Sequence, residues 1–462
     1  MLACRVILFL AWTLHGSISC INLSPCSLLH GASTNMDVHV LSSRVLRPGD
    51  PNSAPSKAPL TVFDRFASNI YIAVLFAFSP PTPPNDALIA GLSKTLLLFP
   101  TLAGRLDDSR RLRRPCLIVG GCGGGALVVE AAASSNLSDH LPLEVSPDFQ
   151  LLHPSPASAV HVFQVQLNRF ACGGLIIGAT AHHRVADGQS MSIFFTAWAQ
   201  TVRGAFVDRP PVYDQSWLKP RCPPHCEFNH WGLEFTPLNS SSVNQIDVDP
   251  SEITNMLIRY SADFIQKLRR KAEGKYTTFE TLIGHLWRKI TVARRLEDRV
   301  QTMVRVSVNG RTRLKPPVPN EFFGNLVLNA YPQATAKDLI DEGLPGAAMM
   351  IHEAIRRVDD RYIQSFIDFG ELYGDEELVP VYDVDGNVLS PMLEVDSWLR
   401  FRFEDVDFGG GGALRAFLPT WVPFEGLVMV LPGFGEDGGI DVFVTLLEEH
   451  AKMLRQISHS LD

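Results

Sequence analysis

Apolar residues recur along the chain at two spacings, one typical of β-strands and the other of α-helices. Alternating or continuous apolar runs predict strands at 38–45, 69–78, 159–167, 173–181, 303–308, 399–403, 426–431 and 440–444. Helical spacing predicts helices at 86–98, 189–202, 261–272, 279–295 and 345–364. A glycine-rich turn at 120–125 predicts a hairpin over 117–130, because no Gly-Lys-Ser/Thr of a phosphate-binding loop follows it. This order of mixed elements predicts an α/β protein.

The apolar strand at 173–181 runs directly into the sequence His182-His183-Arg184-Val185-Ala186-Asp187-Gly188. A histidine can move protons near neutral pH, and a glycine allows the sharp turn by which the chain leaves a strand. With the amphipathic helix that follows, the pattern predicts a strand, a tight loop and a helix, with His183 exposed at the end of the strand. His182 is expected to point to the opposite side. These residues fit a catalytic base, and they also fit a hydrogen-bonded structural histidine.

Composition narrows the class of protein. The chain has 462 residues, of which 46% are hydrophobic and 19% charged, as in a folded globular enzyme of roughly two or three domains. The net charge is -8 and no long basic run occurs, so nucleic acid is not an expected partner. No internal stretch approaches the roughly 20 apolar residues of a membrane span, so no membrane association is expected.

Two segments differ from the rest in composition. Residues 1–35 begin like a secretory signal, but the cysteines beyond them are few and odd in number, without a disulfide framework. We therefore expect an unprocessed or mis-assigned extension and a cytoplasmic protein, rather than secretion with glycans at Asn136 and Asn239. The segment 209–230 is rich in proline and predicts a linker between domains at 36–208 and 231–462. Its Cys222, His225, Cys226 and His230 do not have the spacing of common zinc sites, so no metal is expected.

Four separated motifs carry a family resemblance. They are Phe-Pro-Thr-Leu-Ala-Gly-Arg-Leu at 99–106, His183 with Asp187-Gly188, Asn-Gly-Arg-Thr-Arg at 309–313 with Phe-Gly-Asn at 323–325, and Asp-Phe-Gly-Gly-Gly at 407–411. Together, in this order, they resemble the plant BAHD acyltransferases, which transfer acyl groups from coenzyme A thioesters. One position departs from the family pattern: Gly410 replaces a tryptophan, so altered local packing is expected there.

The resemblance implies a fold, a reaction and roles for several residues. It implies two similar chloramphenicol-acetyltransferase-like domains of mixed sheets and flanking helices, with a channel at their interface, in a protein that is mostly monomeric in this family. It implies acyl-CoA as co-substrate with no bound cofactor, and direct attack on the thioester with His183 as general base. It offers Asp407 as a second catalytic residue. It assigns Asp187, Gly188 and Arg311 to support of the site, with Asp187 and Arg311 paired across the domain interface.

A second resemblance, together with charge, predicts which residues contact the acceptor. Glu-Val-Asp-Ser-Trp at 394–398 is similar to the version in transferases that acylate agmatine, putrescine, tyramine or tryptamine, with a hydroxycinnamoyl or benzoyl group. Asp396, Trp398 and Arg400 are therefore expected to contact the acceptor. A carboxylate at Asp396 would attract an amine, although it also fits a surface acid. Arg400 would repel a dication and makes an aromatic monoamine easier to accommodate.

A basic cluster is expected to bind the phosphates of coenzyme A. The candidate residues are Lys267, Arg269, Lys271 and Thr278, and a solvated end of a helix is the alternative. Two other functions also fit the sequence. One is O-acylation of shikimate, quinate or another alcohol, and the other is binding of acyl-CoA without turnover.

Overall fold

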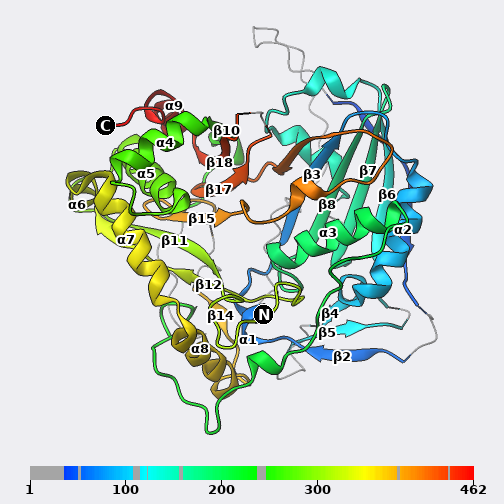
Figure 1. Ribbon diagram of the computed structural model, residues 1–462, viewed down its shortest axis with the longest axis horizontal. Helices are drawn as coiled ribbons and strands as arrows, with labels where there is room; N and C mark the ends of the chain where they lie inside the picture. The colour runs from blue at the N-terminus through cyan, green and yellow to red at the C-terminus, as the bar shows by residue number, and fades with distance from the viewer. Residues whose placement is uncertain are drawn as a thin grey trace, which may run out of the picture.

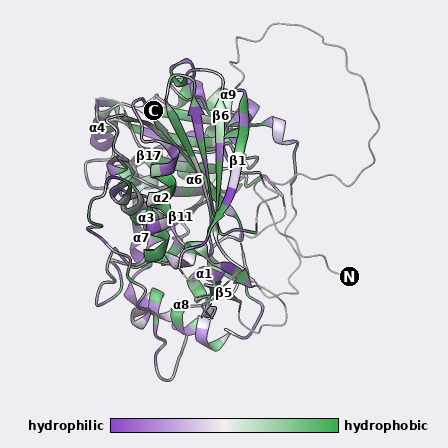
Figure 2. Cartoon of the chain, turned by 90° about the vertical axis from the view of Figure 1, so that its right-hand side faces the viewer, coloured by the Kyte–Doolittle hydropathy of each residue, from purple (hydrophilic) through white to green (hydrophobic). Residues whose placement is uncertain are grey.

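The computed structural model describes residues 36–49, 54–107, 115–121, 123–155, 160–236, 246–381, 386–434 and 437–462. The expectations for residues 1–35 and for Asn239 lie outside these residues. The described chain forms two lobes that lie side by side, each built on a mixed β-sheet (Figure 1). Hydrophilic residues gather on loops and outer helices, whereas the central strands are mostly hydrophobic (Figure 2).

The first lobe is built on a six-stranded sheet in the order β1-β6-β7-β8-β3-β16. Its strands are β1 (Val38–Leu46), β3 (Tyr71–Phe78), β6 (Ala126–Ala133), β7 (Phe163–Phe170), β8 (Leu175–His182) and β16 (Leu414–Pro419). The helices α2 (Asn85–Leu98) and α3 (Gly188–Val202) lie together against this sheet (Figure 1). The buried Trp198 of α3 donates from Nε1 to the Leu88 carbonyl of α2 at 2.9 Å, which fixes the two helices to each other.

The second lobe is built on a seven-stranded sheet in the order β10-β18-β17-β15-β11-β12, with β13 also paired to β11. Its strands are β10 (Ile253–Tyr260), β11 (Gln301–Asn309), β12 (Val327–Ala330), β13 (Gln333–Thr335), β15 (Leu393–Ser397), β17 (Leu427–Pro432) and β18 (Ile440–Leu447). Its helices are α4 (Ala262–Lys271), α5 (Thr278–Ala293), α6 (Ala336–Asp341), α7 (Gly343–Arg357), α8 (Asp360–Leu372) and α9 (Glu448–Ile457).

The two lobes exchange segments. Strand β16 follows most of the second lobe in sequence, yet it pairs antiparallel with β3 of the first sheet, with Leu418 opposite Leu75. In return, the short helix α1 (Val62–Phe66) packs into the second core, where the rings of Phe63 and Phe366 are 5.2 Å apart. The segment 209–230 therefore leads from the first lobe to the second, while α1 and β16 each lie in the lobe opposite to their place in the sequence.

Three predicted elements are wrong. The glycine-rich turn does not close a hairpin, because β5 (Cys116–Val119) pairs with β2 (Ser56–Pro59) and β4 (Arg105–Asp107), whereas β6 pairs with β1 and β7. The single helix at 345–364 is two helices, because Asp359 caps a new one by accepting from the Tyr362 N–H. No strand forms at the expected residues 399–403, which make a turn and the start of a short 3-10 helix. The strand in this part of the chain lies just before them, as β15 (Leu393–Ser397).

The remaining pieces are short. The strands β9 (Phe235–Thr236) and β14 (Val379–Pro380) form a small sheet beside α1. In the part of the chain that the structure describes, no helix has the length and apolar character needed to cross a membrane.

Candidate active site

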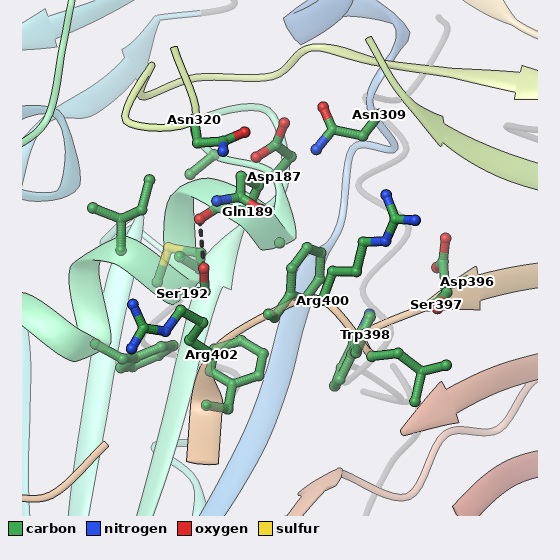
Figure 3. A pocket seen from close by; sticks show the side chains of 18 of the residues that line it. Asp187, Gln189, Ser192, Asn309, Asn320, Asp396, Ser397, Trp398, Arg400 and Arg402 are labelled. Carbon is green, nitrogen blue, oxygen red and sulfur yellow. Dashed lines mark hydrogen bonds between the residues drawn. The ribbon is translucent and has the colours of Figure 1, made fainter. Parts of the chain in front are cut away.

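A cavity of about 1050 Å³ lies between the two lobes. One wall comes from the first lobe, through the end of β8, the loop after it and the start of α3. The other wall comes from β11, β15, the segment after β15 and the first turn of α5. Figure 3 shows polar side chains from both walls directed into this space. The expected channel at the interface therefore corresponds to a cavity in the structure.

His183 follows directly after the last residue of β8 and lines the cavity. Its backbone N–H donates to the Ile70 carbonyl at 2.9 Å, and its carbonyl accepts from Asn325 Nδ2 at 2.9 Å. The ring atom Nδ1 is buried and has no hydrogen-bond partner among the described residues. The hydrogen bonds that hold His183 are therefore those of its backbone N–H and carbonyl, and its side chain faces the cavity.

Asp187 and Arg311 form a buried ion pair across the two lobes. Arg311 Nη1 lies 2.7 Å from Asp187 Oδ2 and Nη2 lies 3.0 Å from Oδ1, with both side chains almost fully buried. The same carboxylate accepts from the Ser190 N–H at 2.9 Å and the Leu326 N–H at 3.0 Å. Because these four bonds occupy both oxygens, the carboxylate is committed to Arg311 and to the start of α3, and it does not form a dyad with His183.

The neighbouring Gly188 is required by a close approach. A Cβ atom at this position would overlap Cε2 of Phe401, which lies beside it on the cavity wall. The glycine thus allows the segment after β15 to pack against the start of α3. This contact joins the loop that carries His183 to the segment that carries Trp398 and Arg400.

His182 points away from the cavity, as predicted. It is buried, its Nδ1 accepts from the Arg184 N–H at 3.2 Å, and its ring lies 4.8 Å from that of Tyr71. Burial lowers the pKa of His182 to about 3, so this ring stays neutral at physiological pH. The two adjacent histidines thus differ in environment: the ring of His183 lines the cavity, whereas the ring of His182 is buried outside it.

Asp396 brings a carboxylate into the cavity wall from β15. Burial, followed by the nearby Glu394 carboxylate, raises its pKa, and a hydrogen bond from Ser307 and the proximity of His183 and Arg305 act in the opposite direction. Glu394 itself is paired with Arg305 on the adjacent strand β11. Asp396 therefore lacks an ion-pair partner of its own in the part of the chain described, and its charge is available to a ligand in the cavity.

Trp398 and two arginines complete this wall of the cavity. The ring of Trp398 is buried against that of Phe417, with 5.4 Å between the centroids, and the backbone N–H of Trp398 donates to the Val430 carbonyl at 2.8 Å. In Figure 3, Arg400 extends toward the side of the cavity where Asn309 and Asp396 lie, while Arg402 extends to the opposite side of the view. Arg402 is paired with Asp405. The structure thus brings Asp396, Trp398 and Arg400 to one cavity, together with His183.

Asp407 is not among the residues that line the cavity. Its side chain is 62% exposed and pairs with Arg203 at 3.4 Å, and one oxygen accepts from the Gly409 N–H at 2.8 Å. The structure therefore does not bring Asp407 to His183. At the departure from the family pattern, Gly410 has φ +86° and an added Cβ would lie 3.0 Å from the Pro81 carbonyl oxygen, so a large side chain would require a different local backbone.

Only one of the four expected phosphate-binding residues lies at the cavity. Thr278 lines the cavity at the first turn of α5. Lys267, Arg269 and Lys271 are exposed on α4 and do not line it. Lys267 pairs with Asp263 at 2.6 Å, and Lys271 donates to the Leu461 carbonyl.

Other cavity residues were missed from the sequence. They include Gln189, Ser307 and Arg402, and also Asn309 and Arg313, which belong to the 309–313 motif but had no role assigned to them. A signal for two of them exists in β11, where Val304, Val306 and Val308 are buried and alternate with less buried residues. Ser307 and Asn309 occupy the alternate positions, so the period of the strand places them on the other face. Among the described residues, no group of three or more His, Cys, Asp or Glu could hold a metal ion.

Comparisons with known proteins match almost the whole chain. The model of the Transferase family matches residues 36–460. Tryptamine hydroxycinnamoyltransferase 2 of Oryza sativa subsp. japonica is 40% identical over 434 residues, covering 92% of this chain and 99% of that protein. Agmatine coumaroyltransferase-1 of Hordeum vulgare is 38% identical over 443 residues, covering 92% of this chain and 100% of that protein.

Solved structures show the same fold. The crystal structure of vinorine synthase aligns with a TM-score of 0.70 at 20% identity, covering 91% of this chain and 98% of that chain. F. graminearum TRI101 complexed with coenzyme A and deoxynivalenol aligns with a TM-score of 0.69 at 16% identity, covering 87% and 97%. The α/β fold with mixed sheets and flanking helices, predicted from the sequence, is confirmed.

Proposed function

The chain belongs to the Transferase family, that of the BAHD acyltransferases, and on this premise we propose that it transfers a hydroxycinnamoyl or benzoyl group from coenzyme A to the nitrogen of an amine. Relatives at 36–40% identity are named as tryptamine, agmatine and putrescine transferases. The observation that carries the amine assignment is the Asp396 carboxylate in the cavity that also contains His183.

His183 is the general base of the proposed reaction. The ammonium that Asp396 binds first loses one proton to solvent. The imidazole of His183 then accepts a second proton from the neutral nitrogen as its lone pair attacks the thioester carbonyl. The C–N bond forms, a tetrahedral oxyanion results, and its collapse breaks the C–S bond and releases the thiolate of coenzyme A, which takes up a proton. No covalent acyl-enzyme and no bound cofactor are required. Asp187 takes no part in the proton transfer, since its oxygens already hold Arg311 and the start of α3.

Asp396 recognises the amine by its charge. An ammonium or guanidinium group in the cavity would form a charge-assisted hydrogen bond with this buried carboxylate. Arg400 lies on the same wall and would repel a second positive charge. This combination favours an aromatic monoamine over a dication, and Trp398 offers an aromatic surface beside it.

The phosphates of coenzyme A require positive charge in a protein of net charge -8. We assign this role to Thr278 at the cavity and to Lys267, Arg269 and Lys271 on α4, the helix that precedes the loop leading to Thr278. Coenzyme A is a long molecule, so its acyl end can lie in the cavity while its phosphates contact residues outside the cavity.

We also propose that the enzyme acts as a monomer in the cytoplasm. The cysteines Cys116, Cys172, Cys222 and Cys226 are free thiols, which fits a reducing compartment.

A substrate panel tests the proposed reaction. The purified protein is incubated with hydroxycinnamoyl and benzoyl thioesters of coenzyme A against tryptamine, tyramine, agmatine, putrescine, shikimate and quinate, and the release of free thiol is measured. Amide formation with an amine supports the proposal. Ester formation with an alcohol would instead establish the O-acyltransferase alternative, and the absence of turnover with every pair would favour a protein that only binds acyl-CoA.

A further inference from the structure

The orientation of the His183 ring depends on its peptide groups. Nδ1 of this ring is buried without a hydrogen-bond partner among the described residues, so no carboxylate or carbonyl holds the ring as in a catalytic triad. The N–H of His183 is held by Ile70 within the first sheet. Its carbonyl is held by a side chain from elsewhere in the chain, that of Asn325.

Asn325 uses both hydrogens of its amide. Nδ2 donates to the His183 carbonyl at 2.9 Å and to Asp64 Oδ1 at 3.0 Å. The side chain is only 3% exposed, and its Oδ1 has no partner in the described part of the chain. A buried amide with one unpaired oxygen is costly to a fold. The two donated bonds therefore fix which way the amide faces.

Asp64 in turn is held by the cap of helix α1. Its Oδ2 accepts from the Thr61 N–H at 2.9 Å and from the Thr61 hydroxyl at 2.8 Å, while Oδ1 accepts from both nitrogens of Asn325. A buried carboxylate with these four donors is a fixed acceptor for the amide of Asn325. The chain of contacts thus runs from the cap of α1 through Asp64 and Asn325 to the carbonyl of His183.

We infer that Asn325, oriented by Asp64, is a positioning residue for the general base His183. The inference rests on the proposed function and adds two residues to it, neither of which lines the cavity. The residues on either side of Asn325 hold the same loop: the Gly324 carbonyl accepts from Ser190 at 2.9 Å, and the Leu326 N–H donates to Asp187. Asn325 is the member of this segment that contacts the histidine itself.

The first test removes the amide. Asn325→Ala frees the His183 carbonyl, and misplacement of a catalytic group by about 1 Å reduces the rate by about a hundredfold. We expect kcat to fall between about tenfold and a hundredfold, with the KM for acyl-CoA and for the amine changed by less than about threefold. The control is Asn255→Ala, which removes a buried amide that makes two bonds to the Val422 backbone away from the cavity. A kcat of Asn325→Ala equal to that of Asn255→Ala would overturn the inference.

The second test separates positioning from stability. In Asn325→Asp, a carboxylate faces both the Asp64 carboxylate and the His183 carbonyl, so melting temperature and kcat should both fall. Adding Asp64→Asn restores a donor between positions 64 and 325 but leaves an oxygen against the His183 carbonyl. We expect the double variant to regain most of the melting temperature while kcat stays at least tenfold low. Recovery of both together would show that the network is only structural.

His183→Ala, assayed in parallel, distinguishes this inference from the proposed function. If His183→Ala keeps the wild-type rate, the proposed base is wrong. If it loses the rate while Asn325→Ala does not, the base stands and the positioning role of Asn325 is wrong.

Discussion

Removal of the Asp187 carboxylate should unfold the protein more readily. In Asp187→Ala, the fully buried Arg311 guanidinium loses its counter-charge, and the Ser190 and Leu326 N–H groups lose their acceptor. Breaking a buried pair in this way costs about 3–5 kcal/mol. Arg311 retains acceptors at Ser190 and at the carbonyls of residues 322 and 324, so a loss of about 4 kcal/mol is expected.

The loss translates into a measurable shift of the melting temperature. With an unfolding entropy of about 2.1 cal/mol/K per residue, about 4 kcal/mol lowers the melting temperature by about 10 °C if a lobe of about 200 residues melts alone. The shift is about 4 °C if the whole chain melts as one unit. Calorimetry or fluorescence at equal protein concentration measures it, with kcat determined well below the transition.

The matched comparison is a double-mutant cycle. Arg311→Ala removes the cation, and the double variant leaves neither charge unpaired. It should therefore be more stable than the sum of the two single losses predicts, by about 1–3 kcal/mol. If the two single losses of unfolding free energy add to that of the double variant within about 0.5 kcal/mol, Asp187 and Arg311 do not stabilise the contact between the lobes as a pair.

Three further outcomes follow from the cavity. Asp396→Asn should raise the KM for the amine by about tenfold or more, with little change in the KM for acyl-CoA. In the wild type, the KM for the amine should rise as pH falls through the pKa of Asp396, which lies above its ordinary 3.8, because protonation removes the negative charge. An unchanged KM for the amine in Asp396→Asn would contradict the assignment of an amine as acceptor. Gly188→Ala should cost about 1–3 kcal/mol and lower kcat, since the added methyl overlaps a phenylalanine ring; equal melting temperatures would contradict this. Simultaneous Lys267→Ala, Arg269→Ala and Lys271→Ala should raise the KM for acyl-CoA severalfold at low salt and less at high salt, and a salt-independent KM would place the phosphates elsewhere.

Local pattern was sufficient for the central part of the site. The apolar run before His183, the glycine after Asp187 and the helical spacing beyond it predicted β8, the loop and α3, because each depends on neighbours in sequence. Partners far away in sequence were accessible only through resemblance to a family, as with Arg311.

Other features had no local signal. The return of β16 to the first sheet could not be predicted, because strand periodicity does not specify the partner strand. The contact of Asn325 with the His183 carbonyl joins a side chain to a backbone atom, which leaves no trace in composition or spacing. Residues 399–403 resembled a strand because apolar residues alternate there, but Phe403 packs on Phe76 and Phe417 from the start of a short 3-10 helix (Phe403–Asp405).

The rate of amide formation by His183→Ala tests most directly whether His183 is the general base. The variant is assayed with the best acyl-CoA and amine pair from the substrate panel, and its melting temperature is compared with that of the wild type. We expect kcat to fall by about a hundredfold or more, since general base catalysis contributes about 10²–10⁴ in rate. The melting temperature should not change, because the ring makes no hydrogen bond through Nδ1 to the described residues. A folded variant that forms the amide at the wild-type rate would show that His183 is not the general base.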